Sequence, residues 1–230
     1  MALLRFWLAC IVTLVFAAGS TGCKSKEETP TPVPSNVAPP DSMLCEGTVR
    51  APDSTWKNVQ QGVGGLASLL PSSAFGVIAV TGGLEVSMGD LIDGSRPASF
   101  VLAGNVLTPE WVIVASARER RAVLAKFPSR GAARLVAPSS VSLERLPLTV
   151  ATDPSGAAPF LVYLSSRGDL VIARDEASAD LLAPYALFGL QPRAIDPAKA
   201  PTHDVSVRFP EAAMPALANV LRLKWTQIEL

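Results

Sequence analysis

The apolar residues divide the chain into three parts. Residues 6–18 form a largely apolar run, FWLACIVTLVFAA, behind a single arginine. Residues 24–43 contain five prolines, several charges and few apolar side chains, a composition that cannot bury enough surface to fold. From about residue 45 onward, apolar residues return at the spacings of helices and strands. The pattern therefore predicts an apolar leader, an extended connecting segment and a folded region.

In the first half of the folded region, the apolar spacing predicts helices and strands in mixed order. A helix is expected over 53–70, with Asp53 or Ser54 as its cap and Pro71 as its end. A strand over 74–80 and a short helical stretch over 84–92 follow. Two strands are then expected over 98–104 and 110–116. Ser116 and Glu119 have the spacing of a capping box, which predicts a helix over 117–127.

The second half repeats this alternation of strands and helices. Two strands, over 159–166 and 169–174, flank Arg167 and Gly168 as a tight hairpin, and a helix over 176–188 comes next. A half-exposed strand over 203–209 is followed by a helix from Pro210, a residue that suits a first helical turn. Hairpins joined to helices in this order predict an α+β fold, with an antiparallel or mixed sheet and helices mainly on one face.

Two strand and helix units resemble each other in sequence. Residues 110–127 align without gaps to residues 168–185 and share an apolar strand, a polar helix start and a closing aromatic residue. The segment from His203 onward also resembles the one that begins at Phe75. A second repeat that begins near 203 is therefore one interpretation, and the chain would then be the amino-terminal part of a longer repeat protein. The alternative is that any two strand and helix units look alike.

The amino terminus has the layout of a bacterial export signal: a positive charge, an apolar run and then small residues. The segment GSTGC, which ends at Gly22 and Cys23, resembles the lipobox of bacterial lipoproteins. That resemblance covers residues 1–23 and implies that residues 1–22 are removed and that Cys23 is acylated. Lys24 is not the aspartate that this class associates with inner-membrane retention. The resemblance therefore implies the cell envelope, and the outer membrane in preference to the inner.

The acyl chains on Cys23 would hold the protein to membrane lipid, because several chains together bind a bilayer almost irreversibly. Residues 23–44 then form a proline-rich tether, and residues 45–230 form one α+β domain. Twenty extended residues at about 3.1 Å each would place that domain up to about 60 Å from the bilayer. Ordinary signal cleavage and an uncleaved membrane span are the alternatives.

Composition restricts the remaining function classes. The 20 basic and 20 acidic residues balance, so no net field attracts nucleic acid. Three cysteines and one histidine are too few for a zinc or iron–sulfur site, and no cofactor motif is present. If Cys23 is acylated, Cys45 is the one thiol left in the processed chain. It is then a small, partly buried residue near the edge of the domain or part of an intermolecular bridge; without acylation, it can form a disulfide with Cys23.

One pattern suggests catalysis. Ser54 and Lys57 have the S-x-x-K spacing of penicillin-binding proteins and serine β-lactamases, although the companion S-D-N and K-T-G elements are missing. A helix cap and a solvated lysine explain the same two residues. His203 lacks a G-x-S-x-G serine partner and is expected at an exposed strand entry.

Three other short motifs favour structural explanations. The segments DLIDG at 90–94 and RGD at 167–169 are typical of turns, and RERR at 118–121 is typical of a solvated helix face. The sequence therefore predicts a lipid-anchored envelope protein with a binding or structural role and an unidentified envelope partner. A serine hydrolase active on the cell wall through Ser54 and Lys57 is the alternative from a different class.

Overall fold

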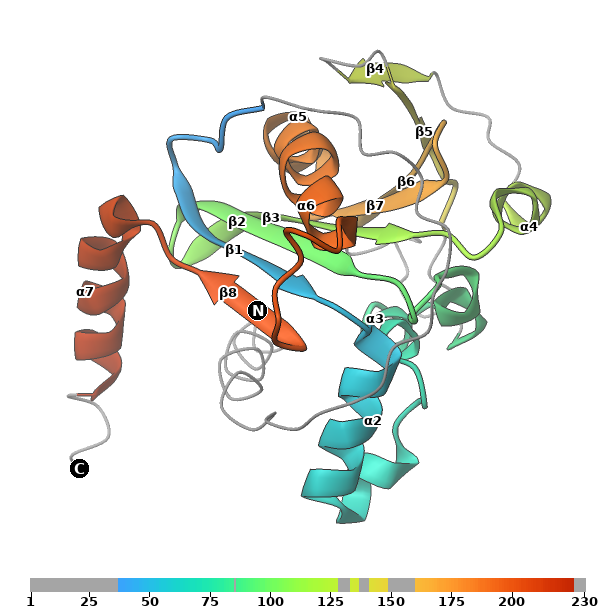
Figure 1. Cartoon of the computed structure of the whole chain (residues 1–230), viewed down its shortest axis with the longest axis horizontal. Helices are drawn as coiled ribbons and strands as arrows, with labels where there is room; N and C mark the ends of the chain where they lie inside the picture. The colour runs from blue at the N-terminus through green and yellow to red at the C-terminus, as the bar shows by residue number, and fades with distance from the viewer. Residues whose placement is uncertain (1–36, 85, 128–132, 137–140, 149–159, 226–230) are drawn as a thin grey trace.

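The described residues form one eight-stranded antiparallel sheet (Figure 1). This computed structural model describes residues 37–84, 86–127, 133–136, 141–148 and 160–225. The strands are β1 Met43–Val49, β2 Ala98–Asn105, β3 Thr108–Ser116, β4 Arg134–Val136, β5 Val141–Arg145, β6 Leu161–Ser165, β7 Asp169–Ala173 and β8 Val205–Arg208. Their order across the sheet is β4-β5-β6-β7-β3-β2-β1-β8, and each pair of neighbours is antiparallel. The predicted α+β class is confirmed.

The helical segments are spread along the chain. The α-helices are α2 Pro52–Val63, α3 Ala74–Thr81, α4 Arg120–Lys126, α5 Glu176–Tyr185, α6 Gln191–Ile195 and α7 Met214–Trp225. Three short 3-10 segments are η1 Gly65–Leu69, η2 Val86–Leu91 and η4 Glu211–Ala213. Segment η3, Ala186–Leu190, is a π-helix that joins α5 to α6.

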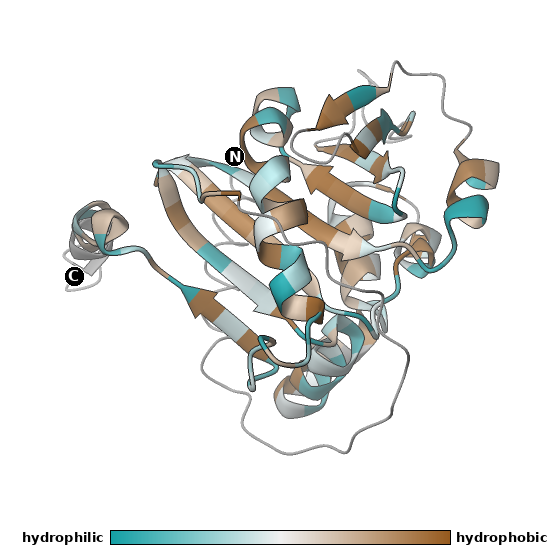
Figure 2. Cartoon of the chain, turned by 45° about the horizontal axis from the view of Figure 1, so that its top comes forward, coloured by the Kyte–Doolittle hydropathy of each residue, from teal (hydrophilic) through white to brown (hydrophobic). Residues whose placement is uncertain are grey.

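Both faces of the central strands are buried, because apolar residues occupy both sides of each pleat. On β3, Val112 and Val114 point to the first face, and Ile113 and Ala115 point to the second. Figure 2 shows the resulting run of hydrophobic residues along the strands. The longest helical run, α5-η3-α6, covers the first face (Figure 1). The shorter helices α3 and α4 contribute Phe75 and Val123 to the core on the second face.

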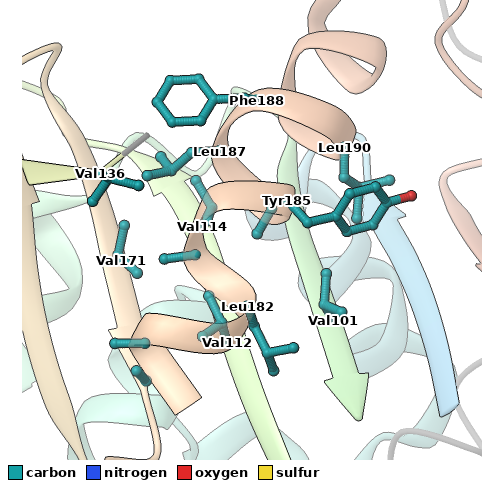
Figure 3. Packing of buried hydrophobic residues seen from close by; sticks show 14 of the residues in the cluster. Val101, Val112, Val114, Val136, Val171, Leu182, Tyr185, Leu187, Phe188 and Leu190 are labelled. Carbon is teal, nitrogen blue, oxygen red and sulfur yellow. The ribbon is translucent and has the colours of Figure 1, made fainter. Parts of the chain in front are cut away.

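The first-face core lies between α5-η3 and the middle of the sheet. Leu182 and Leu187 of the helical run lie in one cluster with Val112, Val114 and Val171 of the strands, as Figure 3 shows. The folded region also starts earlier than expected: β1 begins at Met43 rather than at residue 45, and Val37 packs against this core.

The predicted strand over 74–80 is wrong, because these residues form helix α3. An unbroken apolar run of this length fits a buried strand or a buried helix equally well. Ser73 decides in favour of the helix, since its Oγ accepts a hydrogen bond from the Gly76 amide at 2.8 Å as an N-cap. The proposed similarity between the segments from Phe75 and from His203 therefore fails, since the first begins a helix and the second leads into strand β8.

The helix expected over 53–70 is shorter, and its predicted caps are wrong. Helix α2 begins at Pro52 behind Ala51, which makes no side-chain cap, and ends at Val63. Gly64 and Gly65 have φ values of 63° and 55°, a left-handed conformation that stops a helix. Asp53 instead accepts a hydrogen bond from the Ala74 amide at 3.2 Å and so ties α2 to α3.

The predicted capping box of Ser116 and Glu119 is also wrong. Ser116 is the buried last residue of β3, and α4 begins at Arg120 behind Glu119, whose side chain makes no cap bond. Because α4 packs on the second face and α5 on the first, the units 110–127 and 168–185 do not share one packing arrangement.

The two hairpins and the later elements follow the sequence pattern. Strands β2 and β3 pair directly, and β6 and β7 flank a turn in which Gly168 has a φ of 90°. Helix α5 begins behind Asp175, which accepts a hydrogen bond from the Ser178 amide at 2.8 Å. The strand expected over 203–209 is β8.

Two neighbouring leucines on α5 test the importance of the first-face core. Leu182 is fully buried, whereas Leu181 is 46% exposed. We expect Leu182→Ala to lower the free energy of unfolding by about 2–5 kcal/mol through the cavity it leaves. The matched control Leu181→Ala should change it by less than about 1 kcal/mol. Urea unfolding measures both, and equal effects would contradict this packing.

Candidate functional site

A cluster of buried polar side chains lies on the first face, near the edge formed by β1 and β8. Glu46 and Thr48 of β1 share this face with Val101 and Ser99 of β2, their partners across the ladder. Helical residues Tyr185 and Gln191 lie over them. The exposed fractions of these polar residues are 5% or less: Glu46, Thr48, Ser99, Tyr185 and Gln191. Buried polar groups need hydrogen-bonding partners, so their contacts define what the cluster does.

Glu46 and Tyr185 form the central contact of this cluster. The Tyr185 hydroxyl donates a hydrogen bond to Glu46 Oε2 at 2.5 Å. Arg208 Nη1 lies 3.5 Å from Glu46 Oε1, so the carboxylate also faces a cation. Burial, and then the Glu46 carboxylate, raise the pKa of Tyr185 to about 12. Tyr185 is therefore a protonated donor at neutral pH and not a base or a nucleophile.

A second buried contact fixes α6 to β2. Ser99 Oγ donates to Gln191 Oε1 at 2.5 Å, and Gln191 Nε2 donates to the Pro97 carbonyl at 2.8 Å. Together with the Glu46 contact, it holds the end of the helical run against two neighbouring strands. The arrangement stabilises the position of α5-η3-α6 on the sheet.

The π-helix η3 positions Tyr185 and Gln191. All five of its residues, Ala186–Leu190, are buried. Pro184 lies inside α5 and Pro192 lies at the start of α6, and neither residue has an amide hydrogen to continue a regular α-helical ladder. Gly189 is required here, because a Cβ at this position would lie 2.6 Å from the Tyr185 ring.

The described residues also line a cavity on the second face. Its volume is about 30 Å³, and Phe75, Ile78, Met88, Phe160 and Val162 contribute to its apolar lining. Sites for small molecules usually enclose about 300–1,000 Å³ and carry a few convergent polar groups. This cavity is therefore a packing defect of the second core.

The residues of the predicted hydrolase, Ser54 and Lys57, belong neither to the buried polar cluster nor to the lining of the cavity. Ser54 and Lys57 are exposed on α2, and no residue of α2 lines the cavity. His203 is exposed just before β8, as expected for a strand entry. Ser54 and Lys57 lie one helical turn apart, as the S-x-x-K pattern requires, but neither they nor His203 line the cavity.

Of the three short motifs, RGD lies at the predicted turn, whereas RERR lies only partly on a helix, because α4 begins at Arg120. Asp169 of the RGD turn accepts a weak hydrogen bond from Ser165 Oγ at 3.4 Å, and burial raises the pKa of its carboxyl. Arg167 lies 5.9 Å from the centre of the Phe188 ring. The DLIDG segment ends in a turn at Gly94, which is packed against Asp53. In the RERR segment, Arg120 pairs with Glu144 at 3.7 Å.

Of the two cysteines with predicted roles, only Cys45 lies within the described residues. Cys23 lies outside the described residues. Cys45 is a free thiol in β1 with 8% exposure, and burial, with a smaller contribution from Glu46, raises its pKa to about 11. A buried thiol of this kind is unreactive. Within the described ranges, no group of three or more His, Cys, Asp or Glu side chains is arranged to hold a metal ion.

Sequence reasoning missed Glu46, Tyr185 and Gln191. The available signal was a single carboxylate inside the apolar strand sequence MLCEGTV, since a buried carboxylate needs a partner. The partner itself could not be found, because Tyr185 is 139 residues further along the chain.

Phenylalanine substitutions of two buried tyrosines, Tyr185 and Tyr163, test how much the contact with Glu46 contributes to stability. We expect Tyr185→Phe to lower the free energy of unfolding by about 1–3 kcal/mol, because it removes the donor from a buried carboxylate. The control is Tyr163→Phe, since among the described residues no carboxylate accepts a hydrogen bond from the buried Tyr163 hydroxyl. Its effect should be below about 1 kcal/mol. Equal losses in denaturant unfolding would contradict the role of the Glu46 contact.

The same variant has a pH signature. A pKa raised from 10 to about 12 on folding means that the contribution of Tyr185 to stability is complete below pH 10 and is lost as the pH rises to about 12. Cys45 loses its contribution over a lower range, from 9 to about 11. The difference between the parent and Tyr185→Phe should therefore change mainly above pH 10.

The thiol of Cys45 provides an independent check of burial. In the folded protein we expect alkylation of Cys45 to be at least about tenfold slower than in guanidinium chloride. Peptide mapping after timed labelling identifies the residue that reacts. Equal rates would contradict its burial, and a peptide joined to Cys23 would show a disulfide instead.

Comparison with known proteins adds no relative. No protein-family model, curated protein or solved structure matches this chain.

Proposed function

We propose that this protein is a lipid-anchored component of the bacterial cell envelope with a binding or structural role. The observation that carries the proposal is the sequence around Cys23: a charged start, an apolar run, small residues and then the cysteine. Acylation of Cys23 would attach the chain to membrane lipid, in the outer membrane in preference to the inner.

The arrangement of the folded region supports a tethered domain. The first described strand, β1, begins at Met43, soon after Pro40, the last proline of the proline-rich segment. That segment would act as a spacer between the bilayer and the sheet. Among the described residues, none of the helices combines the length and the apolar character that crossing a bilayer requires.

The character of the polar sites favours binding or structure over catalysis. The buried polar cluster holds a protonated tyrosine against a carboxylate, and the cavity on the second face is small and apolar. Ser54 and Lys57, the residues of the alternative hydrolase, are exposed on α2 and do not line that cavity. An envelope protein partner, of unidentified nature, would bind at the outer surface of the domain.

Serine substitutions of two cysteines near the amino terminus, Cys23 and Cys10, test this proposal. We expect Cys23→Ser to abolish incorporation of a labelled fatty acid and to release most of the protein from the membrane fraction. The matched control Cys10→Ser lies within the apolar run of the leader and should retain both. Fatty-acid labelling, fractionation and mass analysis of the first peptide measure the outcome. Parent protein without an acyl group on Cys23 would overturn the proposal.

A further inference from the structure

Among the described residues, the outer side of strand β8 has no strand partner. Strand β8 is the terminal strand in the order of the described sheet and pairs with β1 alone. The Arg50 amide donates to the Asp204 carbonyl at 2.8 Å, so Asp204 forms a hydrogen-bonded pair with β1. Such pairs alternate along an antiparallel ladder, so the backbone groups of Ser206 and Arg208 also point toward β1. The backbone groups of Val205 and Val207 therefore point outward.

The outward-facing edge is complementary to itself. We propose that two copies of this chain associate by antiparallel pairing of β8 with β8, about a two-fold axis at Ser206. In that register, the amide and carbonyl of Val205 in one copy bond the carbonyl and amide of Val207 in the second. The two-fold symmetry forms the same two bonds between Val207 of the first copy and Val205 of the second. A two-fold contact of this kind is closed, because each copy uses the same edge. The proposal does not depend on acylation of Cys23.

Charge selects this register. Asp204 of one copy comes opposite Arg208 of the second, at non-hydrogen-bonded positions where cross-strand side chains are closest. Within one copy, Arg50 lies 3.3 Å from Asp204, and Arg208 lies 3.5 Å from Glu46. Pairing would therefore build a row of alternating charges on the first face, from Arg50 and Asp204 to Arg208 and Glu46 of the second copy. A shift of two residues would place Asp204 or Arg208 opposite Ser206 and lose these pairs.

The segment after β8 supplies further surface. A strand of four residues is too short by itself, because stable interfaces bury about 800 Å² on each partner. Phe209 and Met214 are exposed by 47% and 52%, next to the free edge. Helix α7 contacts mainly η4, none of its described side chains belongs to either core cluster, and it stands apart from the body of the sheet in Figures 1 and 2. In the dimer, α7 packs its exposed start against the second copy.

A charge-reversal mixture tests the predicted register. The full chain is purified in nonionic detergent, so that its apolar leader does not drive association, and its mass is followed by sedimentation against concentration. We expect a dimer that Asp204→Arg and Arg208→Asp each weaken by about tenfold or more, because each places like charges opposite each other twice. Mixing the two variants should restore dimers, since the arginine introduced in one copy then faces the aspartate introduced in the other, and the native Arg208 faces the native Asp204. Circular dichroism checks that each variant is folded.

A milder substitution keeps the test valid if a charge reversal disturbs folding. Ser206 would meet its own copy at the two-fold axis, at a separation that a disulfide can bridge. We expect Ser206→Cys to form a covalent dimer under mild oxidation, well above the parent background, and the exposed control Ser72→Cys not to do so. A full chain that stays monomeric at all concentrations, or a dimer that crosslinks equally at both positions, would overturn the proposal.

Discussion

The structure depends on burial of the first face of the sheet beneath the α5-η3-α6 run. Apolar contacts supply most of the stabilisation, with Leu182 and Val114 among the fully buried side chains. The helical run also covers Glu46, whose carboxylate would be costly to bury alone. The hydrogen bond from the Tyr185 hydroxyl offsets that cost. The carboxylate is therefore hydrogen-bonded only when the helical run is in its correct position on the sheet.

Glu46 also links the helical run to the edge of the sheet at β8. Glu46 contacts Tyr185 on one side and Arg208 of β8 on the other. The position of the helical run is thereby coupled to that of the terminal strand, and β8 is held against β1 with no strand on its outer side in the described part of the chain. A rigid edge of this kind suits association better than a frayed one, because less ordering is required on binding.

Local sequence predicted those elements whose signals are local. The β2–β3 and β6–β7 hairpins each combine two apolar runs with a short turn, and Gly168 supplies the left-handed residue that the second turn needs. Helix α5 has its own capping residue, Asp175. For the segment 74–80 the element type was wrong, because its apolar run has no periodicity and only the cap at Ser73 distinguishes a helix from a strand.

The sequence by itself determined the class of the fold, the two hairpins and the pattern on which the leader and Cys23 predictions rest, because each depends on neighbouring residues. The tertiary structure alone decided the order of the strands, the burial of Cys45 and the pairing of Glu46 with Tyr185 across 139 residues. Contacts over such separations depend on how sheet faces and helices pack, and a carboxylate within one strand carries no information on which distant hydroxyl will reach it. The free edge of β8 likewise exists only once β1 has paired with it.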